Sequence, residues 1–323
     1  MARALNARQQ FIESADVRHI PVLLEEVTGF LEPERGGLFV DCTLGLGGHA
    51  SALLEAGPKI ELIGIDRDPE ALGYAEKHLR PFGERVRLVP GDFAELEELL
   101  HGLRIEAVDG ILADLGVSSL QLDRGARGFS FRREGPLDMR MGPGDLTAAE
   151  VVNHYAEAQL ENIFREYGEE RQARRIARAI AWRRNQEPIE TTSELRDIVA
   201  GALRRGGGKP RGRIDPATRV FQAIRIEVNR ELIGLDTFLD QAVRMLNREG
   251  RLVVISYHSL EDRIVKNRLR DLARGEVDQI TGRPRSETQV IEVLTKRPVR
   301  PGAEEMAVNP RARSGRLRAA RRI

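Results

Sequence analysis

Short apolar runs alternate with helical patterns along the first 115 residues of the chain. Two stretches place apolar side chains at helical spacing, residues 50–56 and 69–79, the second with proline in its first turn. The apolar runs have the length of buried strands, and three of them end in an aspartate, Asp41, Asp66 or Asp114: residues 38–41, 60–66, 86–89 and 108–114. This alternation predicts βαβ units and a parallel sheet, which binds ligands at the carboxyl ends of its strands.

The pattern becomes purely helical after Asp145. Thr147 and Glu150 form a predicted capping box, and a segment rich in glycine and arginine, residues 204–213, is expected to be flexible. Helical periodicity covers the following stretches: residues 159–167, 171–184, 193–203 and 217–246. Strand patterns return at 250–257, which would complete the sheet, and at 290–294, which would form an edge. The predicted fold class is therefore α/β, with a sheet domain over 1–144 and 216–323 and an all-helical insertion over 145–215.

Composition limits the kind of protein this is. The chain has 323 residues, of which 41% are hydrophobic and 31% charged, so a sizeable core is expected and extensive disorder is not. Cys42 is the only cysteine, which excludes an intrachain disulfide and a cysteine-based zinc site. The first 20 residues lack the apolar stretch of a signal peptide, and no run approaches a membrane span. We therefore expect a soluble, cytoplasmic protein with no membrane partner.

The net charge of +1 conceals two basic segments. From Arg165 to Arg213 there are 13 basic and 7 acidic residues, a local charge of +6, and Lys296 to Ile323 carries 9 basic and 2 acidic residues, a charge of +7. Segregated positive charge favours a polyanionic partner, above all nucleic acid, although solvated helix faces and a basic tail would give the same counts. The aromatic residues of the insertion are expected in its core, with base-stacking platforms as the alternative: Tyr155, Phe164, Tyr167 and Trp182.

The segment after the first strand predicts a cofactor loop. Gly45, Gly47 and Gly48 precede His49 where a helix begins, and glycine lets the backbone turn tightly and approach a ligand. Asp66 ends the next strand, 18 residues beyond Gly48, where an acid can accept hydrogen bonds from ribose hydroxyls. A glycine turn that only packs a helix on the sheet is the alternative. Together the loop and the acid predict a nucleoside-containing cofactor.

The loop fits S-adenosylmethionine better than a dinucleotide. The third glycine of the dinucleotide pattern is missing at its spacing. Asp92 and Phe93, after the third strand, suit the edge and face of an adenine, although Phe93 would also suit the core. Acids after three strands suit a cationic sulfonium and an amino group, and they suit a pyrophosphate poorly.

At these positions the sequence resembles the ribosomal small-subunit methyltransferase H family, also called MraW. The resemblance covers nearly the whole chain from His19, whereas residues 1–18 match nothing recognisable. It is carried by long, ordered motifs: His19-Ile-Pro-Val-Leu-Leu-Glu-Glu-Val, Asp41-x-Thr-x-Gly-x-Gly-Gly-His49, Asp114-Leu-Gly-Val-Ser-Ser-x-Gln-Leu-Asp123, Phe129-Ser-Phe, Asp138-Met-Arg, Thr218-Arg-Val-Phe-Gln-Ala-Ile-Arg-Ile-x-Val-Asn229, Ile255-Ser-Tyr-His-Ser-Leu-Glu-Asp262 and Asn309-Pro-Arg-Ala-Arg-Ser.

The resemblance implies a bacterial enzyme with a Rossmann-like domain and a helical insertion. It implies methyl transfer from S-adenosylmethionine to the N4 amine of a cytidine in the decoding region of 16S rRNA, within the small ribosomal subunit. Carried over by motif, Gly47, Gly48 and His49 would contact the cofactor. Asp66 would hold the ribose, Phe93 would lie by the adenine, and Asp114 and Gln121 would complete the site. Tyr257 stands where this family more often has phenylalanine. A homodimer is left open.

Cytosine N4 is a poor nucleophile because its lone pair is delocalised into the ring. A group that accepts a hydrogen bond from N4–H would orient that pair toward the methyl, and Asp114 is the candidate, unless it only binds the cofactor. Tyr257 or His258, after the last parallel strand, could supply base stacking or a proton route, whereas a structural role suits His258 equally. The Asp-Pro-Pro-Tyr pattern of many amino-methyltransferases is absent, so their detailed mechanism does not transfer.

Other chemistries fit the residues less well. Methylation at cytosine C5 uses a cysteine nucleophile, but Cys42 lies in the cofactor loop. Ribose 2′-O methylation often uses lysines beside an aspartate, and this chain has only five lysines, none near Asp114. The six histidines lack metal-site spacing, so no catalytic metal is expected. A nicotinamide oxidoreductase is disfavoured by the loop, and an RNA-binding assembly factor with a vestigial cofactor site is the remaining alternative.

Overall fold

The computed structural model describes residues 12–14, 17–204, 215, 217–276 and 286–323, and it divides into two compact units. The first unit comprises residues 1–116 and 233–323, and the second comprises Val117–Leu232. The second unit contains the whole of the predicted insertion, residues 145–215, together with residues on both sides of it. The predicted flexible segment, 204–213, lies outside the described residues except for Arg204, which ends a helix.

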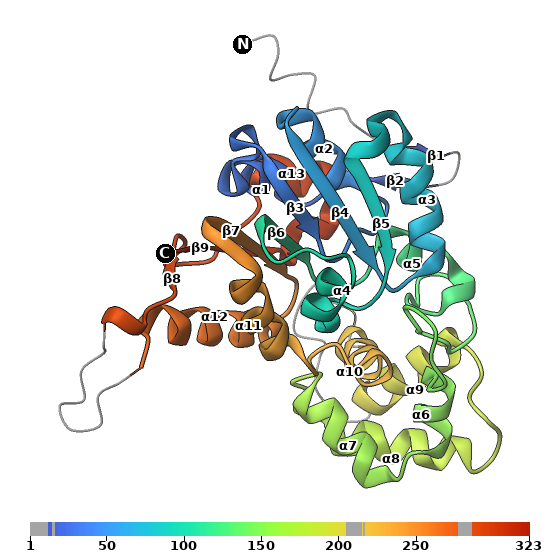
Figure 1. Cartoon of the computed structure of the whole chain (residues 1–323). Helices are drawn as coiled ribbons and strands as arrows, with labels where there is room; N and C mark the ends of the chain where they lie inside the picture. Colours follow the sequence, from blue (N-terminus) through green and yellow to red (C-terminus); the bar gives the residue numbers. More distant parts are fainter. Residues whose placement is uncertain (1–11, 15–16, 205–214, 216, 277–285) are drawn as a thin grey trace. The chain divides into compact units, whose positions relative to one another are not determined.

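A seven-stranded sheet forms the centre of the first unit (Figure 1). The order of its strands is β5-β4-β3-β6-β7-β9-β8, in which the first five are parallel and β9 pairs antiparallel with both β7 and β8. The strand bounds are β3 Gly37–Asp41, β4 Ile60–Asp66, β5 Val86–Pro90, β6 Val108–Asp114, β7 Leu246–Ser256, β8 Ile291–Val293 and β9 Arg316–Arg322. The predicted α/β class and the six predicted strands are confirmed.

Helices cover both faces of this sheet. On one face α4, α11 and α12 pack with the strands into a core that includes Phe238 and Leu252. On the other face α1, α2 and α3 pack around Phe39 and Leu62. The helix bounds in this unit are α1 Leu24–Leu31, α2 Gly48–Ala56, α3 Pro69–Leu79, α4 Leu96–Gly102, α11 Leu235–Met245, α12 Ser259–Arg274 and α13 Ala303–Val308. Two short strands, β1 Ile12–Ser14 and β2 Val17–His19, form a separate antiparallel pair.

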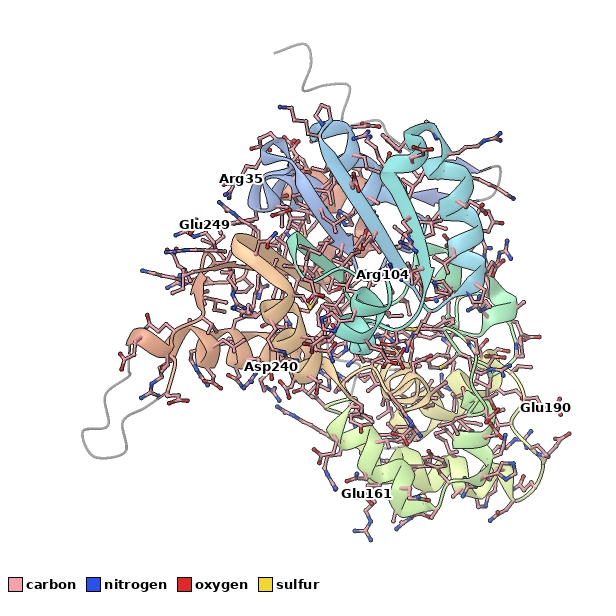
Figure 2. All side chains as sticks on the ribbon, in the orientation of Figure 1. Arg35, Arg104, Glu161, Glu190, Asp240 and Glu249 are labelled. Atoms are coloured by element: carbon pink, nitrogen blue, oxygen red, sulfur yellow. The ribbon has the colours of Figure 1, made fainter. Side chains whose placement is uncertain are left out.

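Ion pairs fasten elements of the first unit to one another. Asp240 on α11, labelled in Figure 2, accepts two N–H bonds of 2.6 Å from the Arg268 guanidinium of α12. At the amino ends of the strands Arg35 donates to the Glu249 carbonyl. The carboxyl ends of the parallel strands lie at the opposite edge, where the predicted site residues are.

Among the described residues of the second unit, the regular structure is helical apart from one isolated β-bridge between Pro136 and Thr191. Its core includes Phe129, Leu160, Phe164 and Ile224. The helix bounds are α5 Ser119–Asp123, α6 Ala148–His154, α7 Glu157–Glu166, α8 Ala173–Arg184, α9 Thr192–Arg204 and α10 Thr218–Asn229. The predicted capping box is present, because the Thr147 hydroxyl accepts from the Glu150 N–H and the Glu150 carboxylate accepts from the Thr147 N–H.

Three sequence predictions differ from the structure. The predicted helical stretch over 217–246 is divided into two helices, α10 and α11, because Arg230 and Gly234 between them adopt positive φ angles. Strand β9 was not predicted. Trp182 is 63% exposed on α8, so its predicted place in the insertion core is wrong, whereas Phe164 is fully buried and Tyr155 and Tyr167 pack against that core.

The basic segment at 296–323 is built into the first unit and is not a free tail. The Arg318 side chain is buried and pairs with Asp262 at 2.7 Å, and Arg321 pairs with Glu249 at 2.6 Å and Glu292 at 2.5 Å. Part of the local charge of +7 is therefore balanced within the protein. None of the helices in the described part of the chain has the length and apolarity needed to span a membrane.

Candidate functional site

Three aspartates meet at the carboxyl end of the sheet. Asp41 ends β3, Asp66 ends β4 and Asp114 ends β6, and β3 lies between the other two strands. Strands β4 and β5 lie on one side of β3, whereas β6 and β7 lie on the other, so the strand order switches direction between β3 and β6. Parallel sheets bind ligands at such a switch point. The topology thus brings together the acids that the apolar runs placed at strand ends.

Asp41 is the most deeply buried of these acids, with 2% of its surface exposed. Burial raises the pKa of its carboxyl group to about 7, and the nearby Asp114 and Asp66 carboxylates act in the same direction. His49 and a hydrogen bond from the Thr43 N–H oppose that shift. Among the described residues, no lysine or arginine lies within 4 Å of Asp41 or Asp114. The three aspartates therefore form an acidic, largely buried cluster without a close lysine or arginine among the described residues, which suits a cationic ligand.

The glycine loop is tied to β4 through Asp66. Its Oδ2 accepts from the Gly45 N–H at 2.7 Å and its Oδ1 from the Asp68 N–H at 2.8 Å, and burial raises the pKa of this carboxyl group. Gly45 and Gly47 have φ angles of +54° and +81°, which favour glycine. A carboxylate has about four acceptor positions, so two backbone bonds leave capacity for two ribose hydroxyls.

Helix α2 begins in this loop at Gly48. The Ser51 N–H donates to the Gly47 carbonyl, so the N–H groups of Gly48, His49 and Ala50 need acceptors from outside the helix. The His49 ring is buried, and neither of its nitrogens has a hydrogen-bond partner among the described residues, although Nε2 lies 3.5 Å from Asp114 Oδ2. A polar ligand would satisfy these groups, so the loop and His49 fit the predicted cofactor.

Asp114 is held by groups from two neighbouring strands. Its N–H donates to the Thr43 hydroxyl at 2.6 Å, and its Oδ1 accepts from the Tyr257 hydroxyl at 2.8 Å. Burial and the Asp114 carboxylate raise the pKa of Tyr257 well above its usual value, so its hydroxyl stays protonated and acts as a donor. Gly116 allows this approach, because a Cβ there would lie 3.3 Å from the Tyr257 ring.

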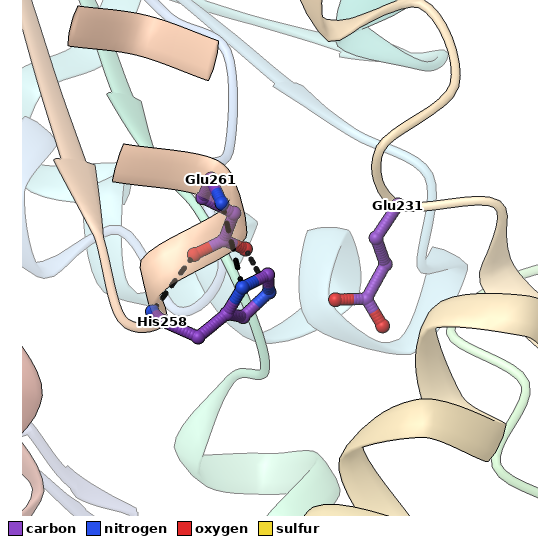
Figure 3. Close-up of side chains that lie close together, drawn as sticks. All are labelled: Glu231, His258 and Glu261. Carbon is purple, nitrogen blue, oxygen red and sulfur yellow. Dashed lines mark hydrogen bonds and ion pairs between the residues drawn. The ribbon is translucent and has the colours of Figure 1, made fainter. Parts of the chain in front are cut away.

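His258 directly follows Tyr257, and its side chain lies beside Glu261 (Figure 3). Its Nδ1 accepts from the Glu261 N–H at 3.4 Å, and its Nε2 lies 3.1 Å from Glu261 Oε1. The other oxygen of Glu261 accepts from the Tyr257 N–H at 2.8 Å and the His258 N–H at 3.3 Å. His258 is thus the N-cap residue of α12 and fixes the backbone beside Tyr257. This geometry accords with the structural role left open for His258, and a catalytic role stays a prediction.

The residues predicted to bind adenine are partly engaged elsewhere. Phe93 packs edge-on against Phe238 with ring centroids 5.1 Å apart, and it remains only half-buried. Asp92 accepts from the Ala94 N–H at 3.0 Å and pairs with Arg67 at 3.3 Å. Phe93 therefore anchors its loop to the core, and its contact with adenine stays a prediction.

Gln121 belongs to the second unit. Its side-chain oxygen accepts from the Ser118 N–H at 3.0 Å, and its own N–H donates to the Ser118 hydroxyl, so the pair forms a capping box at the start of α5. The side chain is buried. Its predicted part in completing the cofactor site stays a prediction.

Cys42 has an environment unlike that of a catalytic thiol. It is 2% exposed, and burial together with the Asp41 carboxylate raises the pKa of the thiol well above its usual value. A nucleophilic cysteine needs the thiolate form and access to its substrate, and Cys42 has neither. Its surroundings argue against a covalent C5 mechanism.

Two residues of the site were not predicted: Asp41 was expected only as the end of a strand, and Thr43 had no expected role. Both lie in the Asp41-x-Thr43 motif directly before the loop. The signal that could have found them is register, because adjacent parallel strands β3 and β6 bring Asp41 and Asp114 to one edge. Thr43 then lies where its hydroxyl can meet the Asp114 backbone.

Comparison with known sequences extends over nearly all of the chain. The sequence model of the MraW methylase family matches residues 16–323. A protein named ribosomal RNA small subunit methyltransferase H from Geotalea uraniireducens is 50% identical over 314 residues, which covers 96% of this chain and all of the relative. Proteins of the same name from Geobacter sulfurreducens and Methylorubrum extorquens are 51% and 46% identical, covering 94% and 100% of this chain and 99% and 92% of the relatives.

Proposed function

Because the chain belongs to the MraW methylase family, we propose that it methylates the N4 amine of a cytidine in the decoding region of 16S rRNA, with S-adenosylmethionine as its cofactor. The observation that carries this proposal is the cluster of aspartates at the carboxyl ends of β3, β4 and β6, whose Asp114 carboxylate is oriented by Tyr257. The substrate would be the RNA of the small ribosomal subunit, in keeping with the names of the relatives.

Different residues of the first unit would bind different parts of the cofactor. Asp66 would accept from the ribose hydroxyls with the positions that Gly45 and Asp68 leave free. The first amides of α2 and the His49 ring would take the polar groups of the methionine part, and Asp41 would balance its positive charge. Phe93, and Gln121 from the second unit, would complete the contacts. The cofactor supplies an electrophilic methyl group on a sulfonium.

Asp114 would act on the nucleophile. An acceptor within hydrogen-bond reach of N4–H turns the amino group so that its lone pair points toward the methyl, and such positioning supplies much of the rate of a displacement. The Tyr257 hydroxyl occupies one side of Oδ1 and fixes the plane of the carboxylate, which leaves other acceptor positions of Asp114 for the substrate. The proton released from N4 would leave through Asp114 or through solvent.

Two features argue against the alternatives. Cys42 is buried with a raised thiol pKa, so covalent C5 methylation lacks its nucleophile. A vestigial site would be expected to lose its buried charges, since an unpaired buried carboxylate destabilises the fold unless function retains it. This chain keeps Asp41, Asp66 and Asp114 together.

A direct assay tests the proposal. The protein is incubated with S-adenosylmethionine labelled on its methyl group and with small ribosomal subunits that lack the modification, and the nucleosides are then analysed by mass spectrometry. Label in N4-methylcytidine is the expected result. Asp114→Asn should reduce the rate by at least about a hundredfold while S-adenosylmethionine still binds, whereas Glu61→Gln, an exposed acid on β4, should change neither. Binding of RNA without transfer would support the assembly-factor alternative.

A further inference from the structure

Helix α8 presents one large apolar side chain to solvent. Trp182 is 63% exposed, and it is the only tryptophan of the chain. The side chains by which α8 joins the core of the second unit are Ala173, Ile176, Ala177 and Ile180. At about 100° per residue Trp182 lies well away from that buried face. Burial in the helical core therefore does not account for this residue.

Arginines share the exposed face with Trp182. Arg174 and Arg178 precede it by eight and four residues, so the three side chains form one stripe about 12 Å long, and Arg175 lies beside it. From Arg171 to Arg184 the chain has six arginines and no acid. We call Arg174, Arg175, Arg178 and Trp182 the α8 stripe.

The positive charge of the α8 stripe is largely unbalanced. Within the described part of the chain, no carboxylate lies within 4 Å of Arg174 or Arg175. Arg178 approaches Glu157 at 3.8 Å, but both side chains are well exposed, and such pairs contribute little in water.

The other arginines of α8 serve the fold. Arg183 pairs with Glu187 at 3.1 Å and approaches Glu194 at 3.8 Å. Arg184 donates to the Val152 carbonyl at 2.7 Å. The helix thus separates arginines that hold its neighbours from those that face solvent with Trp182.

We propose that the α8 stripe binds a single-stranded segment of RNA, with the Trp182 indole stacked on an unpaired base and the arginines on the adjoining phosphates. Proteins that bind single strands combine a basic surface with aromatic stacking platforms, and folded RNA is recognised at loops whose bases can be unstacked. The inference rests on the proposed rRNA substrate and names a surface of the second unit, apart from the cluster of aspartates in the first. A protein partner is less favoured, because the arginines beside this tryptophan carry a largely unbalanced positive charge, which the phosphates of RNA would neutralise.

Trp182 reports on its own contacts because it is the only source of tryptophan fluorescence. The full-length protein is titrated with a single-stranded RNA of about 20 nucleotides copied from the decoding region, and then with the same sequence as a duplex. Stacking should quench the emission with the single strand more strongly than with the duplex, and high salt should reverse the effect. Absence of single-strand binding, or binding seen by anisotropy of labelled RNA without a change in emission, contradicts the proposal.

Substitutions separate stacking from other roles. Trp182→Ala should weaken single-strand binding about tenfold, the change that ~1.4 kcal/mol of stacking produces, and should raise the KM for small subunits with kcat unchanged. Trp182→Phe should restore most of the affinity, whereas Trp182→Leu, apolar but unable to stack, should not. Val308→Ala is the matched control, since Val308 is 68% exposed in the first unit.

Two outcomes would refute RNA binding by the α8 stripe and leave the proposed function unaffected. One is unchanged RNA affinity and KM in Trp182→Ala while methylation proceeds. The other is a change from dimer to monomer in sedimentation of Trp182→Ala, which would make the surface a contact between copies of the chain. Failure of methylation in the unaltered protein would instead refute the proposed function itself.

Discussion

The Tyr257 hydroxyl donates a 2.8 Å hydrogen bond to Asp114 Oδ1, which joins the turn after β7 to the carboxyl end of β6. Glu261 and His258 hold the backbone of that turn, and Gly116 gives the tyrosine ring room. The plane of the Asp114 carboxylate is therefore fixed from outside the cofactor loop. Phenylalanine at this position would lack this bond, so the contribution of the bond can be measured by substitution.

Tyr257→Phe should fold normally and lower kcat about ten- to a hundredfold, because a hydrogen bond to a charged group contributes on the order of 1.5–3 kcal/mol. Affinity for S-adenosylmethionine should change little. Methylation kinetics with small subunits give kcat, and calorimetry gives the affinity. Tyr257→Leu, which also removes the ring beside Gly116, should in addition lower the melting temperature. An unaltered kcat in Tyr257→Phe would show that the bond does not orient Asp114 for catalysis.

Asp66→Ala should weaken S-adenosylmethionine binding by about 1–3 kcal/mol, since two ribose hydroxyls would lose a charged acceptor. The variant also releases the Gly45 and Asp68 N–H groups, so part of the loss would come from a looser loop. Asp66→Asn keeps the shape and separates the two effects. Calorimetric titration measures both variants, with Glu61→Gln on the same strand as the control. Affinity equal to that of the unaltered protein would remove Asp66 from the site.

Asp41 gives the stability of the cofactor-free protein a defined pH dependence. Its pKa is raised from 3.8 to about 7, so the folded state holds a proton that the unfolded state has lost between these values. The stabilising contribution is therefore complete below pH 3.8. Between pH 3.8 and about 7 it falls by about 1.4 kcal/mol per pH unit for one such group, and it is lost as pH rises through 7. Denaturant unfolding of Asp41→Asn from about pH 5 to 8 should lack this slope.

The same titration should affect the cofactor. S-adenosylmethionine carries a positive sulfonium, so its affinity should rise between about pH 6 and 8 as Asp41 ionises, whereas S-adenosylhomocysteine lacks that charge and should respond less. Glu61→Gln should retain both pH dependences. Equal slopes in Asp41→Asn and the unaltered protein would show that another group titrates.

Much of the first unit follows from its apolar runs. Strands β4 and β6 are hydrophobic runs closed by an acid, and both were predicted with the bounds that the structure shows. Strand β9 was missed because Arg316–Arg322 contains four arginines and resembles a solvated tail. The structure buries its Leu317 and Ala319 and neutralises Arg318 with Asp262, a partner 56 residues away that no local pattern reveals.

In the site, too, some features can be predicted from neighbouring residues in the sequence, whereas others depend on contacts between distant segments. The glycine loop and Asp66 are local signals, and the structure joins them by the Gly45–Asp66 hydrogen bond. The Thr43 and Tyr257 contacts with Asp114 depend on strands distant in sequence, so only the fold discloses them. Trp182 was misplaced because it is aromatic, although helical spacing from Ile176 and Ile180 would have put it on the solvent face.

Cys42→Ala should remain active, because the thiol takes no part in N4 transfer. Cys42→Ser is a weaker test, since a hydroxyl buried without a partner costs about 1–3 kcal/mol of stability and could lower the yield of folded protein. The product should be N4-methylcytidine, with no covalent adduct between protein and RNA. Mass spectrometry of the nucleosides and of the protein checks both points. 5-Methylcytidine, or an adduct trapped on Cys42, would overturn the assignment.

Charge reversal of the arginines on α8 tests the second unit as the RNA-binding part of the protein. Arg174, Arg175 and Arg178 face away from the core, so their change to glutamate should leave the fold intact. Substitution is preferable to deletion of residues 145–213. The core of the second unit contains Phe129 and Leu137, which precede that segment, and Val220 and Ile224, which follow it, so the deletion would expose them.

The triple variant should bind small subunits more weakly and methylate them more slowly, with S-adenosylmethionine affinity unchanged. Each phosphate contact contributes about 0.7–0.9 to the slope of log affinity against log salt, so loss of three contacts should make that slope shallower by about two to three. Binding measured from about 50 to 300 mM salt gives the slope, and Arg270→Glu, on an exposed part of α12, is the control for charge alone. Full methylation and an unchanged slope would mean that these arginines only solvate their helix. RNA recognition would then belong to the first unit and its basic segment at 296–323.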